Sequence, residues 1–207
     1  MQKQTVHLFV FNTLSDWEPG YAVAGINNPV LQVRPGNYSV KTVGLTKDPV
    51  TSLGGITILP DMTLDELNPP QSAMLILPGG VTWDEGKNTE AVVKAAAFLA
   101  ANVPVAAICG ATAGLARAGI LDERRHTSNS QEYLKATGYR GEAFYENKPA
   151  VTDRNVITAS GTAPLEFAYQ IFKMLGVYND ETLESWYGLF KTGDLSYFTN
   201  LLRASGT

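Results

Sequence analysis

The chain has 207 residues, of which 44% are hydrophobic and 17% are charged, and its formal net charge is -4. This length and composition are typical of one globular domain that buries a sheet between helices, and they argue against a disordered chain. No basic run extends beyond the pair Arg124-Arg125, so the surface predicted from the sequence does not suit nucleic acid. No stretch approaches the roughly 20 apolar residues of a membrane span. The single cysteine, Cys109, rules out an internal disulfide, and we expect a soluble protein of the cytoplasm.

The first part of the chain alternates between β-type and helical patterns. An apolar run predicts a first strand, and turn formers follow it. The next segment has helical spacing, with Ser15 or Asp16 as its N-cap. Alternating residues then predict a strand and a small β-ribbon. The predicted ranges are 6–11 for the first strand, 17–26 for the helix, 38–45 for the second strand and 53–59 for the ribbon.

Two buried strands carry the most informative sequence. The run AMLIL at 73–77 stops at Pro78-Gly79-Gly80, and the run PVAAI at 104–108 stops at Cys109-Gly110. An alanine-rich helix over 89–101 connects them. Further strands are predicted near 150–152 and 156–159, and further helices over 111–117, 164–175, 182–189 and 197–202.

This alternation predicts an α/β fold: a doubly wound, mostly parallel sheet with helices on both faces and a small β-ribbon. We expect one domain over residues 1–207, with the helices from about residue 180 packing on it or on a partner subunit. Ligands bind such sheets at the carboxyl ends of the strands, which is where both glycine loops and Cys109 fall. The functional site is therefore predicted at that edge.

Cys109 lies at a predicted sharp turn between a strand and a helix. Such a turn lifts its central side chain into the open and needs small neighbours, which Gly110, Ala111 and Gly114 supply. The positive end of the following helix favours a thiolate, so we expect a lowered pKa for this cysteine. The N–H groups of Gly80 and Gly110 could converge on an oxyanion beside the sulfur.

The segments FVFNTLSDWEPG, LILPGG and VAAICGATAGLARAGILDERRHTSN resemble the superfamily of PfpI-type proteases, isocyanide hydratases and the Parkinsonism-associated deglycase. The resemblance spans residues from about 5 to 175 and implies a flavodoxin-like sheet of the class I glutamine amidotransferase-like fold. It implies that Cys109 is the reactive residue and that an acid from the loop after the first strand hydrogen-bonds its thiol. Glu18 is the first choice for that acid and Asp16 the second. The resemblance also implies that Gly79, Gly80 and Gly110 shape an anion-binding pocket.

The chain departs from this pattern at the expected base. The proteases of the superfamily have a histidine directly after the cysteine, where this chain has Gly110. Several relatives have one in the stretch that reads RRHTSN here, at the position of Asn129, while His126 lies three residues earlier. His126 is thus a substitute candidate, and without a secure Cys-His pair protease and glutamine amidotransferase activities are disfavoured.

Other residues complete the predicted site. Trp17 and Trp83 could wall the pocket, although such aromatics are more often core residues, and Thr127 could donate a hydrogen bond. No metal-binding or nucleotide-binding spacing occurs, so we expect no metal and no cofactor. The expected partners are a small-molecule substrate and, by resemblance, a second copy of the chain in a homodimer.

Three functional hypotheses remain open at this point. The first is a cysteine-dependent enzyme acting on a small reactive electrophile, glyoxalase/deglycase-like or hydratase-like, with Glu18 as acid/base. The second is a stress-response protein that senses oxidation through Cys109 without turnover. The third is a binding module whose cysteine has an ordinary pKa.

Overall fold

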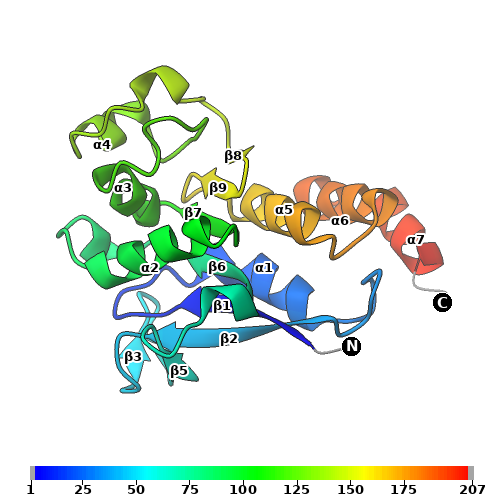
Figure 1. Cartoon of the computed structure of the whole chain (residues 1–207). Helices are drawn as coiled ribbons and strands as arrows, with labels where there is room; N and C mark the ends of the chain where they lie inside the picture. The colour runs from blue at the N-terminus through cyan, green and yellow to red at the C-terminus, as the bar shows by residue number, and fades with distance from the viewer. Residues whose placement is uncertain (1–2, 205–207) are drawn as a thin grey trace.

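A seven-stranded sheet forms the centre of the molecule (Figure 1) in a computed structural model that describes residues 3–204. The strand order is β5-β2-β1-β6-β7-β9-β8, and every neighbouring pair is parallel except β8 with β9. A separate antiparallel ribbon pairs β3 with β4. The strands are β1 (Gln4–Phe9), β2 (Tyr38–Gly44), β3 (Val50–Thr51), β4 (Thr57–Ile58), β5 (Met62–Thr63), β6 (Ser72–Leu77), β7 (Val105–Ile108), β8 (Ala150–Asp153) and β9 (Val156–Ala159).

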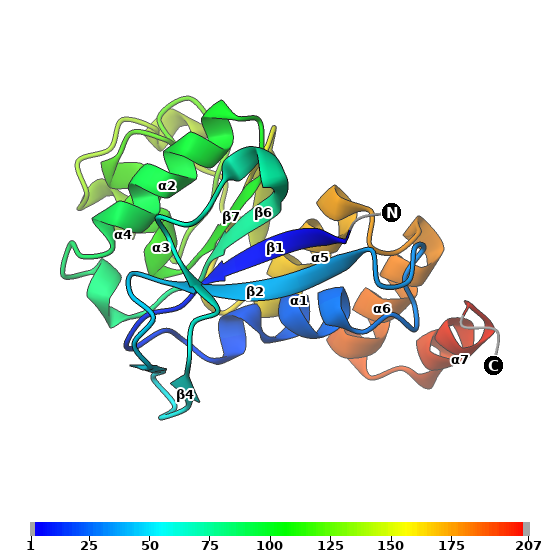
Figure 2. The same ribbon diagram turned by 60° about the horizontal axis from the view of Figure 1, so that its bottom comes forward.

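Helices cover both faces of this sheet, as Figures 1 and 2 show. On one face α1 packs against α5, and α6 packs against α5; on the other, α2 and α3 pack against β6 and β7. The helices are α1 (Trp17–Asn27), α2 (Thr89–Ala100), α3 (Gly110–Arg117), α4 (Gln131–Lys135), α5 (Pro164–Leu175), α6 (Asp180–Thr192) and α7 (Leu195–Ala204), with short 3-10 helices η1 (Pro69–Gln71), η2 (Val81–Trp83) and η3 (Glu142–Phe144). The predicted α/β fold with a mostly parallel sheet and a small ribbon is confirmed.

The central strands owe their place to sequences that are apolar on both faces. All four residues of β7 and all four of β9 are buried, as are the last four residues of β6. A strand buried on both sides reads as a continuous apolar run, which is why these segments were recognisable from sequence. Their carboxyl ends meet at one edge, because β6, β7 and β9 run parallel and adjacent.

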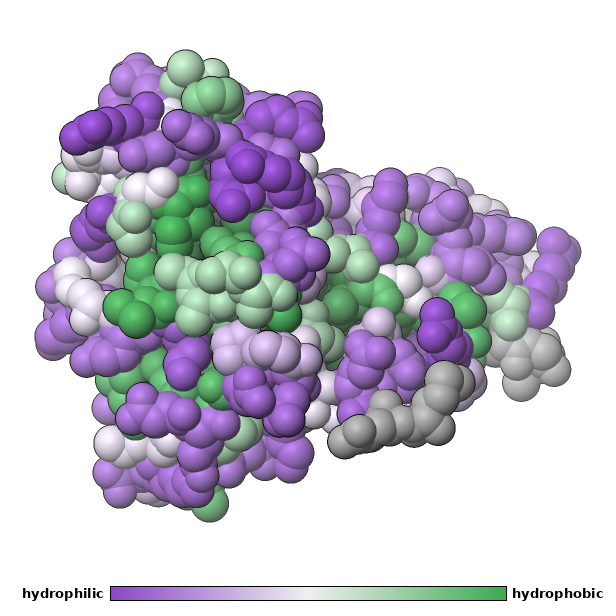
Figure 3. All heavy atoms as spheres, in the orientation of Figure 1, coloured by the Kyte–Doolittle hydropathy of each residue, from purple (hydrophilic) through white to green (hydrophobic). Residues whose placement is uncertain are grey.

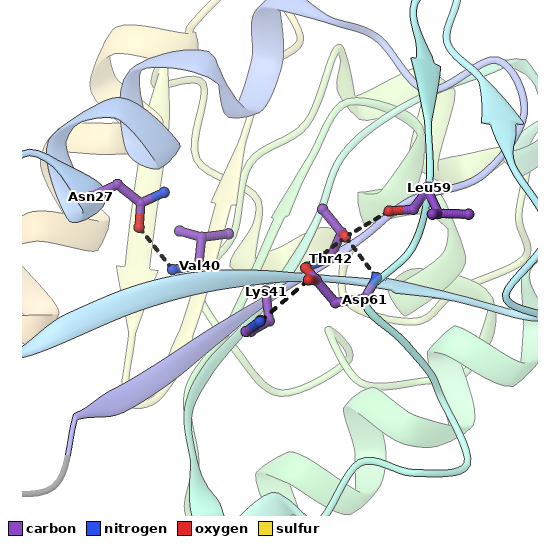
Figure 4. A network of polar contacts seen from close by, with 6 residues as sticks. All are labelled: Asn27, Val40, Lys41, Thr42, Leu59 and Asp61. Carbon is purple, nitrogen blue, oxygen red and sulfur yellow. Dashed lines mark hydrogen bonds and ion pairs between the residues drawn. The ribbon is translucent and has the colours of Figure 1, made fainter.

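The outer strands depend on polar anchors. Asp61 accepts hydrogen bonds from Thr42 N and Thr42 Oγ1, at 2.8 and 2.9 Å, and its carboxylate lies 3.3 Å from Lys41 Nζ (Figure 4). Asn27 at the end of α1 accepts from Val40 N at 3.0 Å, which ties that helix to β2. The edge strand β5 has two residues and was not predicted, because a segment this short carries no periodicity.

The C-terminal helices pack on their own domain. Trp186 of α6 contacts Phe172 of α5 with ring centroids 4.9 Å apart, and Tyr21 of α1 contacts both Trp186 and Phe190. Helix α6 therefore contacts α1 and α5 of its own domain, and packing of the C-terminal helices on a partner subunit stays a prediction. Within residues 3–204, no helix has the length and apolarity needed to cross a membrane. The face drawn in Figure 3 has a hydrophilic rim around more hydrophobic residues near its centre.

Candidate functional site

Cys109 occupies the sharp turn between β7 and α3. Its backbone angles are φ 57° and ψ -126°, a region that side-chain-bearing residues rarely adopt and that costs on the order of 1–3 kcal/mol. Hydrogen bonds on both sides hold the turn: Cys109 N donates to Ala159 O at 3.0 Å, and the Cys109 carbonyl accepts from Thr112 N and Thr112 Oγ1 at 3.1 and 2.6 Å. The side chain lies at the carboxyl edge of the sheet, where the sequence placed it, but it is half-buried and not fully open.

Two glycines close on the cysteine from neighbouring strands. A Cβ added at Gly79, after β6, would lie 2.6 Å from Cys109 Cβ. A Cβ added at Gly161, after β9, would lie 2.8 Å from Cys109 Sγ. Both distances are too short for any side chain, so the backbone of these two loops forms the walls around the sulfur.

Glu18 lies in the first turn of α1 and is completely buried beside this cysteine. Its Oε2 accepts a hydrogen bond from Gly79 N at 2.5 Å. Its Oε1 is sealed from solvent and has no conventional hydrogen-bond partner within the described chain. The position that a Cβ on Gly161 would take is 2.8 Å from Cys109 Sγ and 3.2 Å from Glu18 Oε1, so sulfur and oxygen face the same small space.

Burial dominates the electrostatics of this carboxyl group. It raises the pKa of Glu18 to about 7, although hydrogen bonds from Gly79, the Cys109 thiol and Ser15 act in the opposite direction. At neutral pH the group is therefore divided between its acid and its carboxylate. A group poised in this way can both take and return a proton under physiological conditions.

The thiol departs from the sequence-based expectation of a lowered pKa. Burial and the Glu18 charge raise the pKa of Cys109 to about 11, while hydrogen bonds from Asn129 and Gly110 lower it only in part. The helix N-terminus does not decide the outcome, because a buried carboxylate is the nearest charge. A thiolate therefore forms most readily when its proton passes to Glu18, and the two groups titrate as a pair.

Asn129 is the other side chain that reaches the sulfur. Its Oδ1 accepts from Gly161 N at 2.9 Å, and its Nδ2 donates to Cys109 Sγ at 3.4 Å. Because the amide oxygen is held by Gly161, the amide nitrogen is the atom turned toward the cysteine. Asn129 can thus stabilise negative charge on sulfur, and it cannot act as a base.

Asp16, the second choice for the acid, faces away from this site. Its carboxylate accepts from Ser52 Oγ and, at 2.7 Å, from Gly54 N, which fixes the β3–β4 ribbon. The hydrogen bond from Ser52 is the main reason why the pKa of Asp16 is lowered. Asp16 is the N-cap residue of α1, one of the two alternatives predicted, but its side chain makes no cap hydrogen bond because the carboxylate is held by the ribbon.

His126 is engaged elsewhere in the fold. Its Nδ1 lies 2.7 Å from Arg124 O and its Nε2 lies 3.2 Å from Tyr139 Oη, while its ring packs edge-on against Tyr139 and Tyr145. Burial lowers the pKa of His126, which keeps the ring neutral. Neither nitrogen is available to Cys109, so the substitute-base role is not supported by the geometry.

Three further predicted residues have structural contacts. Thr127 Oγ1 donates to Lys148 O at 2.7 Å, and Thr127 N donates to Thr158 Oγ1. Trp83 is fully buried and its Nε1 donates to Pro78 O at 2.8 Å, so it is a core residue beneath the loop and not a pocket wall. Trp17 is half-exposed and donates from Nε1 to Gly161 O at 3.1 Å, which places it at the rim of the site.

Of the two amides predicted to converge beside the sulfur, Gly110 N faces it, while the role of Gly80 N stays a prediction. The N–H of Gly79 is committed to Glu18, and the N–H of Gly110 hydrogen-bonds the Cys109 sulfur. A Cβ added at Gly80 would lie 2.6 Å from Thr13 O, and one added at Gly110 would lie 3.2 Å from Gly80 O. These glycines shape the turn, and the donors that face the sulfur are Gly110 N and Asn129 Nδ2.

Comparison with known proteins bears on this arrangement. The family model described as "DJ-1/PfpI family" matches residues 4–174. The chain is 45% identical over 205 residues to a Bacillus subtilis protein named "Uncharacterized protease YoaZ", covering 98% of each chain. It is 32% identical over 101 residues to "Deglycase PfpI" of Pyrococcus furiosus, which covers 48% of this chain and 61% of that protein.

A solved structure agrees with both. The thiJ/pfpI family protein from Bacillus anthracis superposes with a TM-score of 0.92 at 45% identity, covering 99% of this chain and 98% of that one. This chain belongs to the DJ-1/PfpI family. The resemblance inferred from the sequence motifs is thereby confirmed, and so is the fold it implied.

Within this DJ-1/PfpI fold, sequence reasoning missed the role of Gly161 and noticed Asn129 only as the residue standing where some relatives have a histidine. Gly161 follows β9, the neighbour of β7, and the carboxyl ends of adjacent parallel strands share an edge. That placement was the available signal for Gly161. No group of three or more His, Cys, Asp or Glu that could hold a metal ion occurs among residues 3–204.

Proposed function

We propose that this DJ-1/PfpI protein is a cysteine-dependent enzyme that acts on a small, reactive electrophile, with glyoxalase/deglycase-like or hydratase-like chemistry. The observation that carries the proposal is the buried Glu18 carboxyl group, which faces Cys109 Sγ and has a pKa raised to about 7. Burying a carboxyl group without a counter-charge lowers the stability of the fold, so a group with a purely structural role is not expected to be buried beside a thiol.

The proposed first step on an aldehyde carbonyl follows from these groups. The Cys109 thiol gives its proton to the Glu18 carboxylate as sulfur attacks the carbonyl carbon. A C–S bond forms, the carbonyl π electrons move to oxygen, and Glu18 returns the proton to that oxygen. The product is a neutral hemithioacetal, and no oxidant, reductant or metal is needed.

The surroundings of the sulfur suit an addition of this kind. Gly110 N and Asn129 Nδ2 both donate toward Sγ and can share negative charge as it moves from sulfur to oxygen. Glu18 is the charged group among the main causes of the raised Cys109 pKa, so negative charge adjoins the sulfur. This favours an uncharged electrophile over one that carries a carboxylate.

The test is consumption of a 2-oxoaldehyde, and of a small nitrile or isocyanide for the hydratase case, by the parent protein and by Cys109→Ser. We expect turnover in the parent on one of these substrates and none above background in the variant. Equal rates in the two proteins, or no turnover of either substrate class, would sink the enzyme proposal.

A second function, oxidation sensing, is supported by one specific observation. The two donors on Sγ could hold the oxygen atoms of a sulfenate, formed by one two-electron oxidation, or of a sulfinate, formed by a second one. Each of these steps reduces one hydroperoxide to water or an alcohol. The mass of the intact protein after hydroperoxide treatment tests this. A gain of two oxygen atoms that is confined to Cys109, in a protein without aldehyde turnover, would favour the sensor.

A further inference from the structure

A second polar feature lies at the edge of the sheet opposite Cys109. There β7 and β9 begin side by side, and Val105 N donates to Asn155 O at 3.0 Å. A hollow of about 560 Å³ opens at this edge. We call it the Arg124–Arg154 hollow, and it is lined by Leu99, Asn102, Pro104, Arg124, Arg154, Asn155 and Met174.

Two arginines line this hollow. Arg124 and Arg154 also line an adjoining hollow of about 440 Å³, so the pair stands between the two spaces. Burial and the positive charge of Arg154 lower the pKa of Arg124, while the negative charge of Asp153 raises it. One carboxylate cannot neutralise two guanidinium charges, so the pair keeps an excess of positive charge that an anion would offset.

The carboxylates of the described chain neutralise the two arginines only in part. Arg124 Nη1 is sealed from solvent and has no hydrogen-bond partner among residues 3–204. Arg154 donates from Nη2 to Glu123 O at 2.6 Å, and its Nε lies 3.8 Å from Asp153 Oδ1. Asp153 in turn accepts from Arg125 N at 2.8 Å through its other oxygen. Asp122 and Glu123 line the adjoining hollow and not this one.

The missing partner can be specified by its chemistry. A tetrahedral oxyanion carries negative charge and offers several acceptors that two forked guanidinium groups can share. Asn102 and Asn155 add side-chain amides, while Leu99, Pro104 and Met174 form an apolar wall that an organic group could cover. We propose that the Arg124–Arg154 hollow binds a phosphate-class oxyanion, free or carried by a small organic molecule.

The probe for the test is inorganic phosphate, titrated at constant ionic strength and followed by phosphorus NMR or calorimetry. We expect saturable one-site binding to the parent and a loss of about tenfold or more in affinity in Arg154→Gln, because charge-assisted hydrogen bonds are removed. Arg34→Gln, a change at an exposed arginine remote from this hollow, is the matched control and should bind like the parent.

Arg124→Gln is a second variant, checked by near-ultraviolet circular dichroism because Arg124 is partly buried. Arg154 is exposed, so its variant keeps the proposal testable even where Arg124→Gln does not fold. Absence of saturable binding overturns the proposal, and so does an equal loss of affinity in Arg34→Gln.

A second arm separates the two sources of the anion. If the anion belongs to an organic ligand, phenyl phosphate should bind more tightly than inorganic phosphate, and Met174→Ala should remove that difference in affinity. Equal affinities for the two probes assign the hollow to free phosphate. Both results require Arg154, and neither depends on turnover at Cys109.

Discussion

Two segments far apart in the sequence approach Cys109, and in each of them one residue reaches the sulfur while a predicted candidate close to it in sequence does not. In the segment at 15–18, Glu18 reaches it while Asp16 holds the β3–β4 ribbon. In the segment at 124–129, Asn129 reaches it while His126 is held by Arg124 and Tyr139. Residues two apart at a helix start, or three apart in an extended segment, point in nearly opposite directions. Only one member of each pair can therefore serve the site.

The difference between Glu18 and Asp16 is tested by replacing each acid with its amide. If the enzyme proposal holds, Glu18→Gln should reduce aldehyde turnover about 10²-fold or more, because the proton acceptor is lost. Alkylation of Cys109 by iodoacetamide should instead become faster at alkaline pH, since the charge that raises the Cys109 pKa is gone. Asp16→Asn is the control and should leave both rates near those of the parent. Slower alkylation in Glu18→Gln would contradict the pairing.

A comparable effect is expected in the pH dependence of stability. Between about pH 4.5 and 7 the folded protein binds the Glu18 proton more tightly than the unfolded chain does. The stability contributed by protonated Glu18 is therefore present below this window and is lost as the pH rises through it, by up to about 3 kcal/mol. Urea unfolding of the parent and of Glu18→Gln across this range measures the difference. A slope of the same size in the variant would exclude Glu18 as its source.

The second segment is tested by separating stability from reactivity. His126→Ala should lower the free energy of unfolding by about 2–3 kcal/mol, because a buried ring and two hydrogen bonds are removed. It should leave the pH profile of Cys109 alkylation unchanged. Loss of Cys109 alkylation in a folded His126→Ala protein would show that His126 does act on the cysteine.

Asn129→Ala should behave in the reverse manner. The side chain is exposed, so we expect little change in stability, but alkylation at a given pH should slow by about tenfold because a donor to the sulfur is lost. Asn129→Asp should slow it as well, since a carboxylate there cannot donate. An unchanged profile in both variants would show that the 3.4 Å contact has no role in tuning the thiol.

The smallest expected effect is the structural role of Asp16. Asp16→Asn replaces a charge-assisted hydrogen bond to Gly54 N by a neutral one and should cost about 1 kcal/mol. Hydrogen exchange should speed up at the amides of the ribbon at 50–58 and remain unchanged at β7. Uniform faster exchange across the sheet would mean that Asp16 supports more than the ribbon.

The sequence by itself determined the parts of this protein that follow from local pattern. The apolar runs of β6, β7 and β9 and the amphipathic α5 have no stable alternative to burial, so their positions and the α/β class could be read directly. The turn at Cys109 could also be predicted, from the small residues that follow it. The structure supplies the reason for one of them, because a side chain larger than hydrogen at Gly110 would meet Trp83.

Tertiary structure decided which side chains meet. The choice of Glu18 over Asp16, the approach of Gly161 and the diversion of His126 all depend on strands and loops that are distant in sequence. The direction of the Cys109 pKa also required the fold, because burial and a neighbouring carboxylate outweigh the helix end that local sequence suggests. Desolvation and through-space charge depend on distances between elements, and those distances have no counterpart in a one-dimensional pattern.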